Sequence, residues 1–302
     1  MSTKSAMIIH GGAGSGRFPA ADARFRELRN ALEEGRSAMR RGSSLEGVQS
    51  AVAYMEEAGV FNAGRGSCLT IDGRVQLDAA IMRGDSRRGA GVGAVTCTYH
   101  PVTLARWLME NTRHVLIVAD DCVPFARAAG LKVSGLKPSE SSLARFEKLK
   151  AEPTPTGREN AKIWKSMNEG NTVGAVAVDA DGIPSAAVST GGMWLKLPGR
   201  VGDSAILGAG VYADRAGAAS ATGTGEEIIR NALCLKACEF IREKGATYGA
   251  SRAIGLISRM SGKGTAGIVT VDARGRVGAS FNTEAMGRAW YDQERGRVVV
   301  RI

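Results

Sequence analysis

The chain has 302 residues, 44% of them hydrophobic, which is enough for a large core and excludes a disordered chain. No segment approaches the roughly 18 apolar residues of a membrane span, and the apolar run Met7–Ile9 is too short for a signal peptide, so we expect a soluble, cytoplasmic protein with no membrane partner. The 40 Lys and Arg residues outnumber the 30 Asp and Glu residues, but they are dispersed and not interleaved with aromatic residues, which favours a solvated surface over a nucleic-acid interface.

The first half of the chain contains both helix and strand patterns. Apolar residues at helical spacing predict three helices, marked by Phe25, Leu28 and Leu32, by Leu45, Val48, Val52 and Met55, and by Leu104, Leu108 and Met109. Ser43 and Glu46 have the spacing of a capping box at the start of the second helix. Short apolar runs predict strands at Met7–Ile9, Val75–Leu77, Ala80–Met82 and Val92–Thr98, and a buried strand at Val115–Val118.

The composition changes between residues 132 and 170, where Lys, Glu, Ser and Pro predict an exposed linker with at most short helices. Beyond it, strands are expected at Val173–Val178, Ala186–Ser189, Gly267–Val271, Val277–Phe281 and Val298–Ile302, and one long helix from Glu226 to about Arg242. Strands outnumber helices and several are joined by hairpin-like turns. We therefore expect a layered α/β fold with substantial antiparallel pairing.

Several common active-site patterns are absent. There is no Gly-x-Ser-x-Gly elbow and no Walker loop, and the three histidines have no evident triad partners. Gly208–Ala213 fits a dinucleotide pattern, but no convincing helix follows it. The five cysteines are odd in number and scattered, which indicates reduced thiols and no zinc site.

Thr172 offers a different chemistry. It lies between the small residues Gly170-Asn171 and the apolar run that begins at Val173. An N-terminal threonine is a self-sufficient nucleophile, because its own α-amine, with a pKa of roughly 7.7 to 8.0, can act as the base. The bond between Asn171 and Thr172 must first be cut, and the Thr172 hydroxyl could do this by attacking the Asn171 carbonyl. The alternative is that Thr172 simply starts a strand, where β-branched residues are favoured.

Two downstream segments could complete such a site. Arg200 and Asp203 are three residues apart on a turn-rich segment, so they could bind the carboxylate and the ammonium of an amino-acid head group, although an exposed ion pair explains them as well. In Ser220–Glu226, glycines expose N–H groups that could stabilise an oxyanion, although a helix N-cap explains this segment equally well.

Taken together, ordered motifs along the chain resemble the plant-type asparaginase and isoaspartyl peptidase family of N-terminal-nucleophile hydrolases. The motifs are His10–Gly14, Phe61–Gly66, Leu77–Ala79, Thr172–Val176, Ser189–Met193, Gly199–Asp203, Thr222–Glu226 and Phe281–Thr283.

The resemblance implies a four-layer αββα sandwich that forms one domain from two fragments. Residues 1–171, including the linker 132–170, would become the α subunit, and residues 172–302 the β subunit, and two such αβ heterodimers would pair. The implied activity is hydrolysis of the side-chain amide of L-asparagine or of β-aspartyl (isoaspartyl) peptides. No cofactor is needed for this catalysis.

The resemblance also implies residue roles. Thr172 would be the nucleophile and Thr190 would position it, Arg200, Asp203 and the Gly225 carbonyl would hold the head group, and Thr222 and the Gly223 N–H would form the oxyanion hole. A structural sodium ion would bind backbone carbonyls of a loop that maps to Met55, Glu56, Ala58, Phe61, Ala63 and Arg65. The chain departs from the family at Asn171, where Gly or Asp is usual. Unlike aspartate, asparagine has no carboxylate that could assist the cleavage.

Three alternatives stay open at this stage. A threonine endopeptidase of the taspase kind would use the same nucleophile on a protein substrate. An uncleaved amino-acid-binding module would keep the Arg200 and Asp203 clamp without turnover. A basic nucleic-acid binder would show a salt-dependent affinity for DNA.

Overall fold

The computed structural model describes residues 5–14, 21–151 and 172–302, and within these ranges no helix is long and apolar enough to cross a lipid bilayer. The strands are β1 (Ala6–Gly14), β2 (Leu77–Arg83), β3 (Gly89–Val95), β4 (Leu116–Val118), β5 (Val173–Val178), β6 (Pro184–Thr190), β7 (Val211–Asp214), β8 (Gly217–Gly223), β9 (Ala266–Asp272), β10 (Val277–Phe281), β11 (Ala285–Asp292) and β12 (Arg297–Arg301). The helices are α1 (Ala21–Arg41), α2 (Ser44–Glu57), α3 (Pro101–Asn111), α4 (Cys122–Ala128), α5 (Glu140–Ala151), α7 (Gly225–Asn231), α8 (Leu233–Lys244) and α9 (Ala246–Ser261).

The strands form two sheets. The larger has the order β12-β11-β1-β5-β6-β2-β3-β4 and the smaller the order β10-β9-β8-β7. The pairs between named strands are antiparallel except β3 with β4. The expected α/β fold with substantial antiparallel pairing is therefore confirmed.

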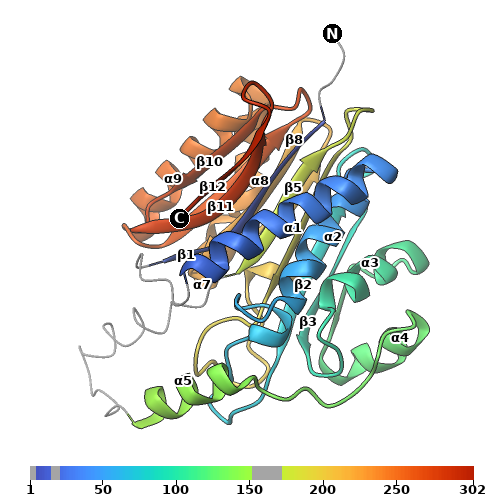
Figure 1. Cartoon of the computed structure of the whole chain (residues 1–302), viewed down its shortest axis with the longest axis vertical. Coiled ribbons are helices and arrows are strands. Elements are labelled where there is room, and N and C mark those ends of the chain that lie inside the picture. Colours follow the sequence, from blue (N-terminus) through green and yellow to red (C-terminus); the bar gives the residue numbers. More distant parts are fainter. Residues whose placement is uncertain (1–4, 15–20, 152–171) are drawn as a thin grey trace.

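Three apolar clusters hold the helices and the two sheets together. Alternate residues of a strand point to opposite faces, so one strand can contribute to two clusters. In β5, Val173 and Ala175 pack with α1, α2 and α3, whereas Val176 and Val178 pack against the smaller sheet. The other face of the smaller sheet packs on α8 and α9. Figure 1 shows α1 to α3 and α8 to α9 on opposite sides of the strands.

The helix that the capping-box pattern predicts is confirmed in detail. Ser43 is the N-cap of α2, its side chain and that of Glu46 form the reciprocal bonds, and the expected face is buried. A cap depends on four neighbouring residues, so a local sequence pattern is sufficient to predict it.

The long helix expected from Glu226 to Arg242 is wrong, because two helices occupy this segment. Ala232 lies between α7 and α8 in the left-handed conformation, with φ of 45°. The first turn of α8 bonds outside the helix, with Cys234 N donating to Ala209 O and Leu235 N donating to Gly208 O. Tertiary hydrogen bonds therefore override a continuous apolar pattern.

Other strand and linker predictions also need correction. The strand expected to be buried at Val115–Val118 is the edge strand β4, which begins at Leu116, and both Val115 and Leu116 are about half exposed. The separate strands at Val75–Leu77 and Ala80–Met82 are one strand, β2. The described part of the linker holds the helix α5, and its Phe146 is buried against the core, so this part is not wholly exposed.

Candidate active site

Thr172 and Thr190 lie side by side at one end of the larger sheet. Thr172 directly precedes β5, Thr190 ends β6, and the antiparallel register pairs Val173 with Ser189. Thr172 Oγ1 donates to Thr190 Oγ1 at 3.3 Å, and both side chains are buried. The pairing of two central strands thus brings the two predicted threonines into direct contact.

The Thr190 hydroxyl is held by further donors. Gly192 N donates to Thr190 Oγ1 at 3.0 Å, and Asn62 Nδ2 lies at 3.5 Å from the same oxygen. Asn62 also donates to Gly192 O at 2.7 Å and accepts from Cys68 N at 2.8 Å. The sequence reasoning gave Asn62 no role, although it belongs to the Phe61–Gly66 motif and an amide both donates and accepts.

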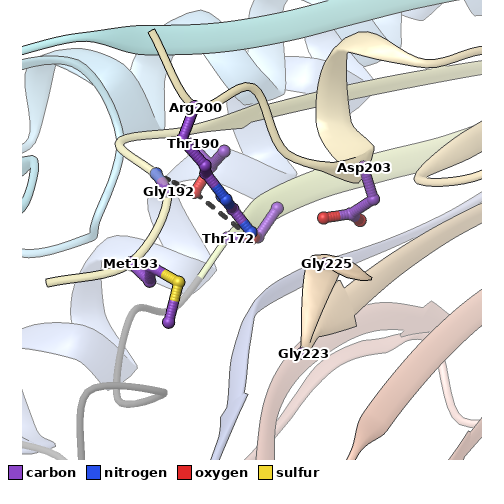
Figure 2. Close-up of a pocket in the computed structure, with 8 residues that line it drawn as sticks. All are labelled: Thr172, Thr190, Gly192, Met193, Arg200, Asp203, Gly223 and Gly225. Carbon is purple, nitrogen blue, oxygen red and sulfur yellow. Dashed lines mark hydrogen bonds between the residues drawn. The ribbon is translucent and has the colours of Figure 1, made fainter. Parts of the chain in front are cut away.

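Thr172 and Thr190 line a pocket (Figure 2). It is lined by Thr172, Thr190, Gly192, Met193, Arg200, Asp203, Gly223 and Gly225, and it measures about 300 Å³ with the open space at its mouth. The structure therefore brings together six residues to which the sequence reasoning assigned roles. It adds Gly192 and Met193, which had been noted only as parts of a motif.

Arg200 forms its ion pair with Glu226 and not with Asp203. Its Nε and Nη2 donate to Glu226 Oε1 at 2.9 and 2.8 Å, and the arginine side chain is 18% exposed. The alternative of an exposed Arg200–Asp203 pair is therefore wrong. Asp203 is itself buried, and its Oδ2 has no hydrogen-bond partner in the part of the chain that the structure describes.

Burial raises the pKa of the Asp203 carboxyl to about 7, while the Arg200 charge acts in the opposite direction and the Asp78 and Glu226 charges add to the rise. Desolvation disfavours the charged form of a carboxyl, and a cation placed beside it restores that form. Asp203 is thus a buried acid that lacks a cationic partner. The ammonium of an amino acid would supply one.

Asp78 holds the backbone between Arg200 and Asp203. Its Oδ2 accepts from Gly202 N at 2.9 Å, and its Oδ1 accepts from Ala94 N at 2.8 Å. Asp78 is fully buried, so both bonds are shielded from water. The sequence reasoning gave Asp78 no role, although the Leu77–Ala79 motif contains it.

Gly225 lies between the two charged side chains of the pocket. A Cβ on this residue would stand 2.8 Å from both Arg200 Nη2 and Asp203 Oδ1. Any side chain here would displace one of the two charged groups. Glycine at this position therefore lets both charged groups lie close to the backbone of Gly225.

Thr222 and Gly223 end β8, in the smaller sheet. Thr222 is fully buried, and its Oγ1 lacks a hydrogen-bond partner among the described residues. Gly223 lines the pocket with φ of +141°, a conformation open to glycine, whereas Thr222 is not one of the lining residues. Both sheets therefore contribute to this region.

His10 of β1 pairs with Gly174 of β5, the strand that follows Thr172. Its Nε2 lies 3.0 Å from Ser220 Oγ, a contact that joins β1 of one sheet to β8 of the other. Burial lowers the pKa of His10 to about 3, against a smaller opposing effect of the Thr172 backbone. The imidazole is therefore neutral at physiological pH.

The residues of the expected sodium loop follow one another around the end of α2. Met55 and Glu56 are in its last turn, Ala58 is its C-cap, and Phe61, Ala63 and Arg65 follow in the loop and a short 3₁₀ helix. The Glu56 side chain is buried, which raises its pKa to about 8, and its Oε1 accepts from Val102 N at 3.1 Å. No cluster of His, Cys, Asp and Glu side chains suited to a metal occurs in the described ranges.

Two further expectations concern cleavage and redox state. Asn171, the residue before the expected cleavage point, lies outside the described residues. All five cysteines are free and buried.

Comparison with known proteins agrees with the resemblance seen in the motifs. Residues 3–300 match the family model described as "Asparaginase". A plant-type L-asparaginase of Pyrobaculum calidifontis is 43% identical over 94% of this chain and 96% of its own length. An isoaspartyl peptidase of Escherichia coli is 37% identical over 95% and 92%, and an isoaspartyl peptidase/L-asparaginase of Danio rerio is 36% identical over 97% and 93%. The chain belongs to the asparaginase family.

Proposed function

We propose that this protein hydrolyses the side-chain amide of L-asparagine and the isoaspartyl bond of β-aspartyl peptides, with Thr172 as the nucleophile. The observation that supports this best is the contact of the buried Thr172 and Thr190 hydroxyls in a pocket that also holds Arg200 and Asp203. The names of the relatives, which include both L-asparaginases and isoaspartyl peptidases, agree with it.

The nucleophile is generated by cleavage of the bond between Asn171 and Thr172. The Thr172 hydroxyl attacks the Asn171 carbonyl, and the C–N bond breaks as the ester forms, which frees the Thr172 amine. Water then hydrolyses the ester, which releases the Thr172 hydroxyl and leaves a carboxylate on Asn171. Thr190 Oγ1 already accepts the hydrogen bond from Thr172 Oγ1, so the attacking oxygen is oriented before cleavage. The α-amine then takes the hydroxyl proton in each later turnover.

Head-group recognition follows from the charges of the pocket. The guanidinium of Arg200 binds the α-carboxylate, and the substrate ammonium gives Asp203 its missing cation. Thr172 then attacks the side-chain carbonyl, ammonia or an amine leaves, and a β-aspartyl ester forms and is hydrolysed. Because the head group is held on one side, the leaving group can vary.

The Thr222 hydroxyl and the Gly223 N–H stabilise the oxyanion of the tetrahedral intermediate. A buried hydroxyl without a hydrogen-bond partner has a free donor and loses no water contact during the reaction. Its free donor supports this role.

We propose further that the order of helices and sheets is the four-layer αββα sandwich of the N-terminal-nucleophile hydrolases, with fragments 1–171 and 172–302 in one domain.

Intact mass before and after incubation at neutral pH tests the mechanism. The expected result is two fragments of 171 and 131 residues, since 302 minus 171 is 131, the smaller beginning Thr-Val-Gly-Ala. Thr172→Ala should stay intact and inactive, while Thr172→Ser should retain partial activity. An intact wild-type chain with full activity on β-aspartyl dipeptides would refute the N-terminal nucleophile.

We also propose that the loop after α2 binds a structural sodium ion through the carbonyls of Met55, Glu56, Ala58, Phe61, Ala63 and Arg65. In support, two glycines of this loop let backbone carbonyls approach closely. A Cβ on Gly64 would lie 2.3 Å from Glu56 O, and one on Gly66 would lie 2.3 Å from Phe61 O. Hard cations prefer such oxygen ligands. The ion would stabilise the loop that presents Asn62, and a higher melting temperature in sodium than in tetramethylammonium chloride would support it.

Finally, we propose a cytoplasmic enzyme in which two αβ units pair. The free thiols fit a reducing compartment. The half-exposed apolar residues of the edge strand β4 offer a surface for pairing. Light scattering after size exclusion should give twice the chain mass of 31.6 kDa.

A further inference from the structure

Glu226 is the one acidic side chain bonded to the Arg200 guanidinium within the described residues. Both hydrogen bonds go to a single oxygen, Oε1, and engage Nε and Nη2, which form one edge of the planar guanidinium. The opposite nitrogen, Nη1, has no acceptor in the described part of the chain. It stands 3.2 Å from the place where a Cβ of Gly192 would be, and Gly192 lines the pocket.

A guanidinium presents five N–H groups in a fixed fork. Because Glu226 occupies the Nε edge, a ligand carboxylate can meet Arg200 only through Nη1 and the second hydrogen of Nη2. An arginine side chain also has many rotamers, and a partner that accepts from two of its nitrogens removes most of them before the ligand arrives. Glu226 thus decides both where the guanidinium stands and which edge it offers.

The position of Glu226 fits this role. It follows Gly225, the residue without a side chain that lies between Arg200 and Asp203, in the first turn of α7. Glu226 itself is 39% exposed and is not a lining residue of the pocket. It therefore reaches the ligand only through Arg200.

We propose that Glu226 is a positioning residue that fixes the Arg200 guanidinium for end-on capture of the α-carboxylate of an aspartyl or asparaginyl head group. This inference rests on the proposed function and adds a determinant of ligand affinity to it. The ion pair is part of the site itself, and the ligand carboxylate joins Glu226 on the guanidinium instead of replacing it.

The charge of Glu226 also affects the pKa of Asp203, the second charged residue of the pocket. Burial is the main cause of the raised pKa of Asp203, Arg200 opposes the rise, and the negative charges of Asp78 and Glu226 add to it. Neutralising Glu226 should therefore move the acidic limb of the pH profile of kcat/KM to lower pH. A purely structural role of Glu226 would not produce this shift.

The test compares Glu226→Ala and Glu226→Gln with the wild type and with Glu227→Gln. Glu227 is a matched control, because it lies in the same helical turn but pairs with Arg230 and accepts from Ser261. Titration calorimetry with L-aspartate measures head-group binding without turnover. Kinetics with L-asparagine, on protein whose cleavage has been verified by mass, separate KM from kcat.

For Glu226→Ala we expect the Kd for L-aspartate and the KM for L-asparagine to rise about 10-fold or more, as for a lost charge-assisted hydrogen bond, with kcat within about threefold. Glu226→Gln keeps the acceptor oxygen, so its KM should stay within about threefold of the wild type while the acidic limb shifts. Glu227→Gln should change none of these quantities.

Unchanged or tighter binding in Glu226→Ala would overturn the proposal, and tighter binding would make Glu226 a competitor for Arg200. A Glu226→Ala chain that stays uncleaved would also overturn it by assigning Glu226 to maturation. If the wild type binds L-aspartate but does not hydrolyse asparagine or β-aspartyl peptides, the proposed function fails while the calorimetric comparison still decides the role of Glu226.

Discussion

The buried Asp203 carboxyl should make the protein less stable at neutral and alkaline pH. Its pKa in the folded state is raised from 3.8 to about 7, so between these values the folded chain binds more protons than the unfolded chain. Stability is then full below about pH 4, falls as the pH rises, and reaches its lower value above about pH 7. At about 1.4 kcal/mol for each pH unit, the loss amounts to about 4 kcal/mol.

Asp203→Asn removes this loss because asparagine does not ionise. We expect the difference in unfolding free energy between Asp203→Asn and its parent to become more favourable by about 2–4 kcal/mol from pH 4.5 to pH 8. The comparison is made by urea denaturation in a Thr172→Ala background, so that both proteins remain single chains. Taking the difference between two pH values cancels the packing cost of the amide and the titration of every other group.

The same substitution in the Thr172 protein should lower kcat/KM for L-asparagine at least about 100-fold, because the ammonium loses its counter-charge. If the Asp203 carboxyl serves binding and lowers stability, both the pH-dependent gain in stability and the loss of kcat/KM should be observed for Asp203→Asn. If the stability difference between variant and parent were the same at pH 4.5 and pH 8 within about 0.5 kcal/mol, Asp203 would not have a raised pKa and the reasoning would fail.

Three further outcomes follow from other contacts. Thr190→Val should lower kcat about 10- to 100-fold with little change in KM, since it removes the hydroxyl 3.3 Å from Thr172 Oγ1; an unchanged kcat in a stopped assay would contradict this. Gly174→Ala should cost about 2 kcal/mol or more in urea denaturation, because its Cβ would lie 2.4 Å from the Nε2 of His10, and an equally stable variant would show that the strands can separate there. The melting temperature of Glu56→Gln relative to the wild type should rise from pH 4.5 to pH 9, because the pKa of Glu56, raised by burial from 4.5 to about 8, makes the wild type lose stability progressively between these two pH values; the same difference in melting temperature at both pH values would argue against it.

Local patterns predicted the elements that depend on neighbouring residues. The α2 cap needs only Ser43 and Glu46, and the predicted apolar faces of α2 and α3 are buried, whereas Phe25 of the face predicted for α1 is 39% exposed. The α7–α8 break could not be predicted in this way. It depends on hydrogen bonds between Cys234 and Leu235 and the distant Gly208–Ala209 turn, and Ala232 shows no sign of a break in the sequence.

In the candidate site, too, short sequence motifs identified some residues and missed the long-range contacts. Motif resemblance identified the residues that line the pocket, because each motif is a short segment with its own signature. It did not identify Glu226 as the partner of Arg200, since an Arg200–Asp203 pair is closer in sequence and equally plausible by charge. It also gave no role to Asn62, whose contact with Thr190 spans 128 residues.

The buried polar atoms without partners explain why the site is costly to fold and ready to bind. Asp203 Oδ2 and Thr222 Oγ1 are withdrawn from water and have no acceptor or donor among the described residues. Such groups destabilise the folded chain, and the cost is recovered when a ligand completes them. In the proposed mechanism, an amino-acid ammonium completes Asp203, and a developing oxyanion, which exists only during the reaction, completes Thr222. The first group therefore favours binding of the ground state, whereas the second favours the transition state, and variants at the two positions should change KM and kcat respectively.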